Sequence, residues 1–252
     1  MCRSEKIDYS NINEFVGSLE ELFADFKWPY QNIKLYSDNG LSENIGKTGG
    51  SVPLDDVEAT VSQMFDTYIA QCLQDYFSET AVEVERGHIR QYPDIELRGE
   101  PLPETPLALD IKSAMRNPDN EDVLNSAVAV GTHGTYFNNP RKDCTGIKRP
   151  YGTYNSHIVL VFVYSIFDNY SQLSERRYVD DIEITAAQKW EMATTQSASG
   201  RRNYIAAPRR VKELLHCSGD FDCREDFEQY WQDPVGEAYV SKNQLSFDEF
   251  ED

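Results

Sequence analysis

Two aspartates and a lysine lie in and beside a pair of short apolar runs between Tyr92 and Met115. Asp94 follows a proline at the start of the first run, and Asp110 and Lys112 lie inside the second, LALDIK. Residues two apart in a strand point to the same face, so Asp110 and Lys112 should project together while the residue between them faces the opposite core. If the two runs pair as a hairpin, Asp94 comes near Asp110. Buried charges are costly unless they are paired or bind a metal, so these residues are candidates for a functional site.

The chemistry that these residue types suit is metal-assisted hydrolysis. Two carboxylates on one sheet edge can hold Mg²⁺, which prefers oxygen ligands and keeps several waters. A cation held there would polarise a phosphodiester and lower the pKa of a bound water. Lys112 could orient that water or offset charge in the transition state, and it could act as a base only if its pKa were depressed. The alternative is an ordinary surface ion pair, because Asp and Lys two apart on a strand are common.

The charge of the chain is unevenly distributed. The net charge is −19, yet residues 136–216 hold 12 bases and 8 acids, a balance of +4. The bases gather at 141–149 and 200–212. This pattern indicates an anionic ligand held by that region only, while the acidic remainder would limit nonspecific DNA binding. Solvated surface and adaptation to high salt are the alternatives.

The surrounding elements predict one α/β domain with a central mixed sheet flanked by helices. Helical spacing occurs at 11–26, 54–77 and 224–233, and strands are expected at 80–85, 94–97, 107–112, 158–167 and 182–185, with a loop at 116–122. The longest apolar run has ten residues, too few to cross a bilayer. The chain opens on polar residues without a signal peptide, and its five cysteines have no disulfide spacing, so a cytoplasmic protein with reduced thiols and no membrane partner is expected.

The order of these motifs resembles the type II restriction endonucleases of the PD-(D/E)xK superfamily, most closely the EcoRV-like enzymes. The resemblance rests first on YPD, a short strand, a proline-containing connector and ALDIKSA. It continues through GTHGTYFNN at 131–139, QKWEMATTQSASGRRNYIAA at 188–207 and GDFDCREDFEQYWQD at 219–233, and so spans residues 10–234. It implies a restriction-endonuclease-like fold, with a small dimerisation segment at 1–50, a catalytic and DNA-recognition domain at 51–240, and an acidic tail at 241–252.

This resemblance also implies an activity. A homodimer would use Mg²⁺, or Mn²⁺ in its place, to cut both strands of a short palindrome in double-stranded DNA, with blunt ends. A cognate DNA methyltransferase would be present in the same cell, without a stable complex. By the family pattern Asp94, Asp110 and the Ile111 carbonyl would be metal ligands and Lys112 the catalytic lysine. The family also places an acid on the preceding long helix, for which Glu58 is the first choice and Asp66 the second. A solvated helix residue is the alternative for Glu58.

The segment SASGRRNYI aligns without a gap to the small, polar recognition loop of the family. Arg201 and Arg202 occupy two of its reading positions, and arginine can bond guanine O6 and N7 in the major groove. We therefore expect G·C pairs in the recognition site, read by Ser199, Gly200, Arg201, Arg202 and Asn203. An arginine that instead grips phosphate would strengthen binding to all sequences alike. The candidates for DNA backbone or minor-groove contacts are Arg90, Gln91, Arg141, Lys142, Lys148 and Arg149.

Two other functions fit the same sequence. Another nuclease of this superfamily, such as a repair or junction-resolving enzyme, would cut by DNA structure without sequence preference. An acidic interaction protein that mimics DNA would explain the charge of −19. The basic region and the D-x-K strand count against that second possibility.

Overall fold

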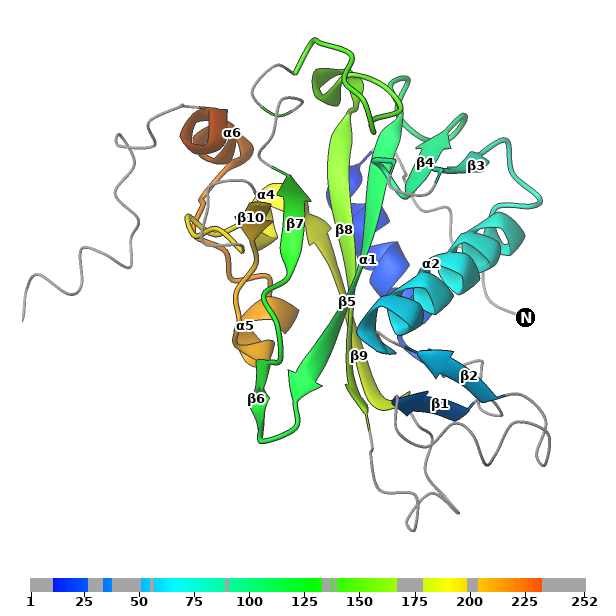
Figure 1. The fold of residues 1–252 in the computed structure, drawn as a ribbon. Coiled ribbons are helices and arrows are strands. Elements are labelled where there is room, and N and C mark those ends of the chain that lie inside the picture. Colours follow the sequence, from blue (N-terminus) through cyan, green and yellow to red (C-terminus); the bar gives the residue numbers. More distant parts are fainter. Residues whose placement is uncertain are drawn as a thin grey trace, which may run out of the picture.

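A mixed β-sheet forms the centre of the protein, as the sequence predicts (Figure 1). The computed structural model describes residues 11–26, 34–37, 51–54, 57–88, 91–132, 137, 140–166, 179–198 and 204–232. The strand order is β3 (Glu83–Arg86), β4 (Ile95–Arg98), β5 (Leu107–Asn117), β8 (Ser156–Ile166) and β9 (Val179–Gln188). Only the β5–β8 pairing is parallel along this path, and β6 (Asn120–Leu124) pairs with β5 outside it.

The sheet separates two hydrophobic cores. Along β8 every second residue faces one core, as Ile158 and Leu160 do, and the residues between them, such as Val159 and Val161, face the other. Strands buried on both faces read as continuous apolar runs, which explains why β8 carries no Asp, Glu, Lys or Arg. Figure 1 shows α1 (Ile12–Phe23) and α2 (Val57–Tyr76) on one side of this sheet. On the other side lie α4 (Lys189–Met192), α5 (Val211–Leu215), α6 (Arg224–Gln232) and a small sheet of β7 (Ala129–Thr132) and β10 (Tyr204–Ala206).

Helix α1 belongs to the same core as the sheet. Its side chains at Phe15, Leu19 and Phe23 recur every four residues and are buried, and Asn11 caps its first turn by accepting from Asn13 N. Glu20 fixes the helix to β9 by accepting from Ala186 N at 2.9 Å. The pair β1 (Lys34–Ser37) and β2 (Ser51–Leu54) is parallel. Residues 1–10, 38–50 and 241–252 lie outside the described residues, so the proposed division at residues 50 and 240 stays a prediction.

One expected loop is wrong. Residues 116–122 form the end of β5, a two-residue turn and the start of β6. Asn117 closes the turn, because its Oδ1 accepts from Asp119 N at 2.8 Å and Asn120 N at 3.2 Å. The short helices α4 and α5 were not predicted either.

No helix among the described residues is long and apolar enough to cross a membrane.

Candidate active site

The candidate site lies where the β4–β5 ladder stops. The pairing of β4 with β5 ends at Ile95 opposite Leu109, so the next residues of β5 have no strand beside them on that side. The Asp94 side chain replaces a strand partner here, because its Oδ2 accepts a hydrogen bond of 2.7 Å from the amide of Ile111. The predicted hairpin therefore forms, and its end brings Asp94 to Asp110.

The alternation of β5 separates the polar and apolar residues of the site. Asp110 and Lys112 are in register with Val159 and Val161 of β8 and lie on the same face of the sheet as those two residues. Ile111 is buried in the core on the opposite face, with Ile158 and Leu160. Lys112 Nζ donates to Asp110 Oδ1 at 2.7 Å. Asp110 is only 4% exposed. The predicted common face of Asp110 and Lys112 is thus confirmed, and their ion pair is largely buried rather than a surface pair.

The two carboxyl groups are crowded enough to retain a proton. Burial raises the pKa of Asp94 to about 8, and the neighbouring Asp110 carboxylate adds to this rise. Burial also acts to raise the pKa of Asp110, but the ammonium groups of Lys112 and Lys189 outweigh it and hold that pKa below its usual value. The pair therefore retains one proton and one negative charge near neutral pH, unless another cation arrives.

Lys112 remains an ammonium group in this environment. Burial alone would lower its pKa, but the Asp110 and Asp94 carboxylates outweigh burial and raise it. A lysine with a raised pKa is a hydrogen-bond donor and a positive charge. It is not a base in this state.

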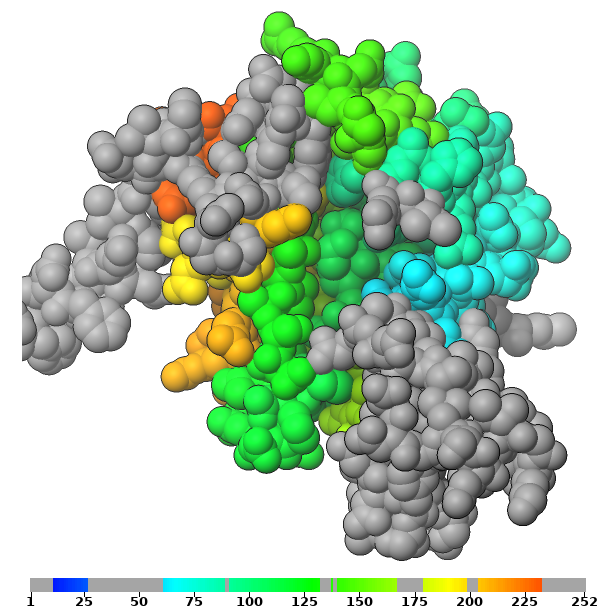
Figure 2. Space-filling model, in the orientation of Figure 1, coloured from blue at the N-terminus to red at the C-terminus, as the bar shows by residue number. Residues whose placement is uncertain are grey.

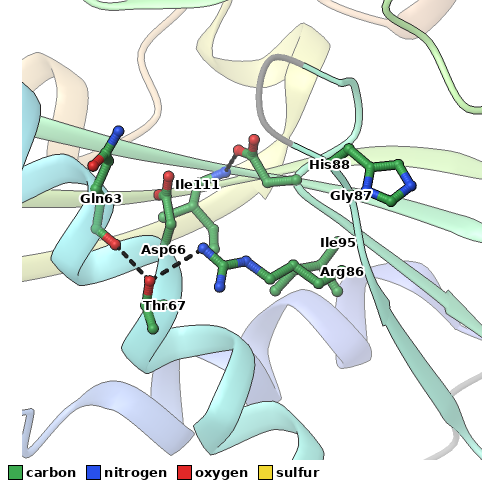
Figure 3. A pocket seen from close by; sticks show the side chains of 9 residues that line it. Gln63, Asp66, Thr67, Arg86, Gly87, His88, Ile95 and Ile111 are labelled. Carbon is green, nitrogen blue, oxygen red and sulfur yellow. Dashed lines mark hydrogen bonds between the residues drawn. The ribbon is translucent and has the colours of Figure 1, made fainter.

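A third carboxyl group reaches the site from α2. Asp66 lines a cavity of about 570 Å³ together with Asp94 and Ile111, and Figure 3 shows Asp66 beside Ile111. Burial raises the pKa of Asp66 to about 6, with Lys112 opposing the rise and Asp110 adding to it. Its Oδ1 is buried and accepts no hydrogen bond within the described part of the chain. Glu58 lies eight residues earlier, about 12 Å along the helix axis, and its side chain is outside the described residues. Of the two acids considered on this helix, Asp66 is the one placed at the site.

A second cavity, of about 420 Å³, opens on the other side of Asp94. Asp94, Asp110 and Lys112 line it, and so does Tyr204 of β10. The opposite wall includes residues 145–147 of the basic segment and Gly131 of β7. In the view of Figure 2 the surface is hollowed between the green strip of β6 and β7 and the cyan residues of α2. Asp94 borders both cavities and therefore lies at the centre of this face.

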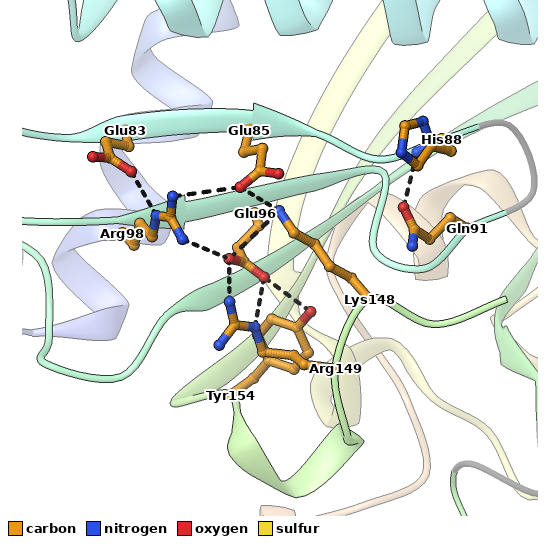
Figure 4. Close-up of polar contacts among 9 residues, drawn as sticks. All are labelled: Glu83, Glu85, His88, Gln91, Glu96, Arg98, Lys148, Arg149 and Tyr154. Atoms are coloured by element: carbon orange, nitrogen blue, oxygen red, sulfur yellow. Dashed lines mark hydrogen bonds and ion pairs between the residues drawn. The ribbon is translucent and has the colours of Figure 1, made fainter. Parts of the chain in front are cut away.

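Two of the predicted phosphate contacts are engaged with carboxylates. Arg149 donates two hydrogen bonds, of 2.8 and 2.7 Å, to the fully buried Glu96 (Figure 4). Lys148 Nζ lies 2.6 Å from Glu85 and 3.5 Å from Glu96. Any phosphate bound by Lys148 or Arg149 would have to compete with these ion pairs. Arg141 and Lys142 are exposed and form no ion pair among the described residues.

The remaining DNA candidates lie at the edges of the second cavity. Gln91 lines it, and its Oε1 accepts from His88 N at 3.0 Å, whereas Arg90 is outside the described residues. The whole recognition set, residues 199–203, is outside them too. Its two ends are joined by a hydrogen bond of 3.0 Å from Ala198 N to Tyr204 O. Tyr204 is 42% exposed and lines the cavity together with Asp94 and Asp110, so the described residue that follows the recognition set lies at the candidate site.

Sequence reasoning missed several residues of the site. Glu96 could have been found, because it is two residues after Asp94 and lies between the apolar residues Ile95 and Leu97 of the same strand. Lys189 and Tyr92 carried no such signal, since a lysine that ends a strand is usually solvated. Tyr204 directly follows the recognition loop, and that position was its only indication.

The donor set at the site fits a hard divalent cation. Among the described residues no three Asp, Glu, His or Cys side chains are close enough to make a ligand set by themselves. Two carboxylates, a backbone carbonyl and several waters are sufficient for Mg²⁺. An incoming cation would meet a carboxyl pair that retains a proton and an Asp66 oxygen that accepts no hydrogen bond among the described residues. The cation would supply the positive charge that these groups lack.

Comparisons with known proteins agree with this geometry. The family model "Restriction endonuclease EcoRV" matches residues 25–249. A curated relative, the type II restriction enzyme EcoRV of Escherichia coli, is 24% identical over 170 residues, a match that covers 63% of this chain. The match covers 65% of that relative, which is less than two thirds of its length. Because the family match extends over most of the chain, the protein belongs to the EcoRV restriction endonuclease family.

Proposed function

We propose that this protein is a type II restriction endonuclease, a Mg²⁺-dependent hydrolase that cuts double-stranded DNA at a short palindrome. The observation that carries the proposal is the convergence of Asp94, Asp110 and Lys112 at the end of the β4–β5 ladder. Membership of the EcoRV family supports the same reaction class. The relative named above is a restriction enzyme by its description.

The residues of the site have separable roles in this proposal. Asp94 and Asp110 would hold Mg²⁺ or Mn²⁺, with the Ile111 carbonyl as a further ligand and Asp66 as the acid from α2. The bound metal would supply a water of lowered pKa and would polarise the phosphodiester. Lys112, kept charged by Asp110, would donate to the scissile phosphate or the attacking water. The apolar floor of β5 and β8 excludes bulk water, and exclusion of water strengthens each of these electrostatic interactions.

DNA would enter along the second cavity. Arg141 and Lys142 are exposed on the segment that forms its wall, and they remain candidates for phosphate contacts. Residues 199–203, which directly precede Tyr204, would read the major groove. We propose that Arg201 and Arg202 read guanines there, so that the site contains G·C pairs.

The function is tested by digesting a large, fully sequenced DNA with the purified protein, with and without Mg²⁺. Discrete fragments that require Mg²⁺, and whose ends share a short palindrome, are the expected result. The sequenced ends would give the site and the position of the cut. A smear of fragments would favour a nuclease that recognises DNA structure or that cuts without any preference. No cleavage with any divalent metal would favour a binding protein.

The proposed base reading has a separate test. Arg201→Ala should relax discrimination at one base pair by about 1–3 kcal/mol, measured as cleavage rates on sites that differ at that pair. Arg209→Ala is the matched control, since Arg209 lies on the same segment and reaches the Leu124 carbonyl at 3.4 Å. A uniform loss of affinity for all sequences in Arg201→Ala would instead indicate a phosphate contact.

A further inference from the structure

A second lysine lies beneath the site, where it has no contact with solvent. Lys189 follows directly after β9 and is 1% exposed. The register pairs Val159 of β8 with Asp110 on one side and Ala187 on the other, so these three residues form one row on one face of the sheet. Lys189 is two residues after Ala187, at the start of α4, and its Nζ lies 3.0 Å from the hydroxyl of Tyr92, which lines the second cavity together with Asp94 and Asp110.

A chain of hydrogen bonds fixes the ammonium group. Lys189 Nζ lies 3.0 Å from the hydroxyl of Tyr92, which lies 2.6 Å from His157 Nδ1. His157 Nε2 is 3.0 Å from the Tyr151 carbonyl, which can only accept, so Nε2 carries the proton and Nδ1 of the neutral ring accepts. Tyr92 must therefore donate to His157, and its remaining lone pairs accept from Lys189. The directions of all three bonds are consistent with a charged Lys189 and a neutral His157.

This cation has no ion-pair partner within the described residues. Its other close contact is the face of the Tyr92 ring, 4.3 Å from Nζ to the ring centroid. Burial lowers its pKa to about 8, while the charge of Asp110 opposes that change. A buried charge without a direct counter-ion destabilises a fold unless nearby charges compensate it. The nearby negative charge is the one shared by the carboxyl pair of Asp110 and Asp94, which would also hold the proposed metal.

We propose that Lys189 is a positioning residue of the active site, whose buried charge offsets the joint charge of Asp94 and Asp110 and thereby weakens and sets the affinity of the site for its divalent metal. This inference rests on the proposed metal-dependent function. Lys189 would act through the two carboxylates and not on the DNA, because it is buried against Tyr92. The buried charge keeps the carboxylate pair partly neutralised before the metal binds.

The inference predicts a gain of metal affinity, which loss of a merely structural residue would not produce. Removing one positive charge near the site strengthens binding of any cation. Protons also bind more tightly in such a variant, but Mn²⁺ carries two charges and gains more than a competing proton does. Neutral replacements of Lys189 should therefore bind Mn²⁺ roughly tenfold more tightly than the unaltered protein.

The experiment is a titration of the purified full-length protein with Mn²⁺ in the absence of DNA, followed by the electron paramagnetic resonance signal of free Mn²⁺. Lys189→Met and Lys189→Gln are two neutral variants of similar size, and near-ultraviolet circular dichroism checks that each is folded. Lys189→Arg retains the charge and should bind Mn²⁺ within about twofold of the unaltered protein. Asp110→Asn reports on the metal site itself and should bind at least about tenfold more weakly.

The outcomes distinguish a failure of the role of Lys189 from a failure of the proposed metal site. Unchanged or weaker Mn²⁺ binding in the folded neutral variants would overturn the role of Lys189. Equal tightening in Lys189→Arg would overturn it as well, because shape and not charge would then be the cause. If the unaltered protein binds no Mn²⁺, or Asp110→Asn binds it equally well, the proposed metal site fails and the role of Lys189 fails with it.

Discussion

Asp94 serves both the backbone and the site. Its Oδ2 completes the edge of β5 by accepting from Ile111 N, and the same carboxyl group crowds Asp110. Asp66 adds a third carboxyl group with one orphaned oxygen. Burial of the Asp94 and Asp66 carboxyl groups therefore lowers the stability of the fold, and replacing one of them should raise the free energy of unfolding.

Asp66→Asn should lower the cleavage rate by about 10–100-fold, whereas Glu58→Gln should leave it within about twofold, because Asp66 lines the cavity beside Asp94 and Glu58 begins two turns earlier on the helix. Asp66→Asn should also be more stable than the unaltered protein when no metal is bound. Asp66 has a pKa of about 6 in the folded protein against 3.8 in the unfolded chain, so the folded state loses stability as the pH rises through that interval and carries the full penalty above it. Removing the group should raise the free energy of unfolding by about 1–3 kcal/mol at neutral pH.

The measurements are initial cleavage rates and urea unfolding in EDTA. A full rate in Asp66→Asn together with a loss in Glu58→Gln would restore Glu58 as the helix acid.

His157 should make stability depend on pH. Burial, with added repulsion from Lys189 and Arg224, holds its pKa well below 6.5 in the folded protein. The unfolded chain therefore takes up a proton that the folded protein does not, as the pH falls below about 6.5. The free energy of unfolding should fall there by up to about 1.4 kcal/mol per pH unit, until the folded pKa is reached.

His157→Gln should flatten this dependence, measured by urea unfolding across a pH series. His216→Gln is the control, since it removes an exposed histidine by the same substitution. Parallel slopes in all three proteins would contradict the neutral, buried state of His157.

At the scale of elements, β4 joins the catalytic residues to the basic segment. Glu96 on β4 accepts from Arg149 and lies 3.2 Å from the Tyr154 hydroxyl, as Figure 4 shows. The segment itself runs beside Tyr92, with Tyr92 N donating to the Gly146 carbonyl at 2.8 Å and Lys148 N donating to the Tyr92 carbonyl at 2.9 Å. One strand thus fixes both Asp94 and the wall of the cavity that it lines.

Glu96→Gln should therefore destabilise the protein by about 1–3 kcal/mol, because it removes the charged partner of two Arg149 hydrogen bonds at a buried position. Glu83→Gln on the neighbouring β3 is the matched control. Glu83 pairs with Arg98 at 2.6 Å in solvent, where an ion pair contributes little. Urea unfolding measures both variants, and equal effects would mean that the Glu96 cluster is not structurally important.

The sequence was informative where pattern and burial agree. The apolar run of β8 and the four-residue spacing of α1 predicted their elements, and the alternation of β5 predicted the common face of Asp110 and Lys112. Strand β6 was missed because three of its five residues, Asn120, Glu121 and Asp122, are exposed and polar, which resembles a loop. Lys189 could not be found from the sequence, because its burial depends on Tyr92 and His157, which are distant in sequence and near only after folding.

At the scale of the whole molecule, function would require two copies. A chain with one carboxylate pair can cut one strand, and a two-fold palindrome is matched by a two-fold dimer. We predict a solution mass of twice the 28.9 kDa chain, measured by light scattering on a size-exclusion column. A monomer that remains monomeric on DNA would contradict cutting of both strands by one bound assembly.

The central claim is that Asp110 belongs to a metal-dependent nuclease site. It is tested most directly by incubating the unaltered protein, Asp110→Asn and the exposed control Asp119→Asn with the same DNA, in Mg²⁺ and in EDTA. We predict Mg²⁺-dependent cleavage by the unaltered protein and by Asp119→Asn. Cleavage by Asp110→Asn should be at least about 100-fold slower, while its DNA binding is retained. Cleavage by Asp110→Asn at the unaltered rate, or equal cleavage in EDTA, would contradict the account.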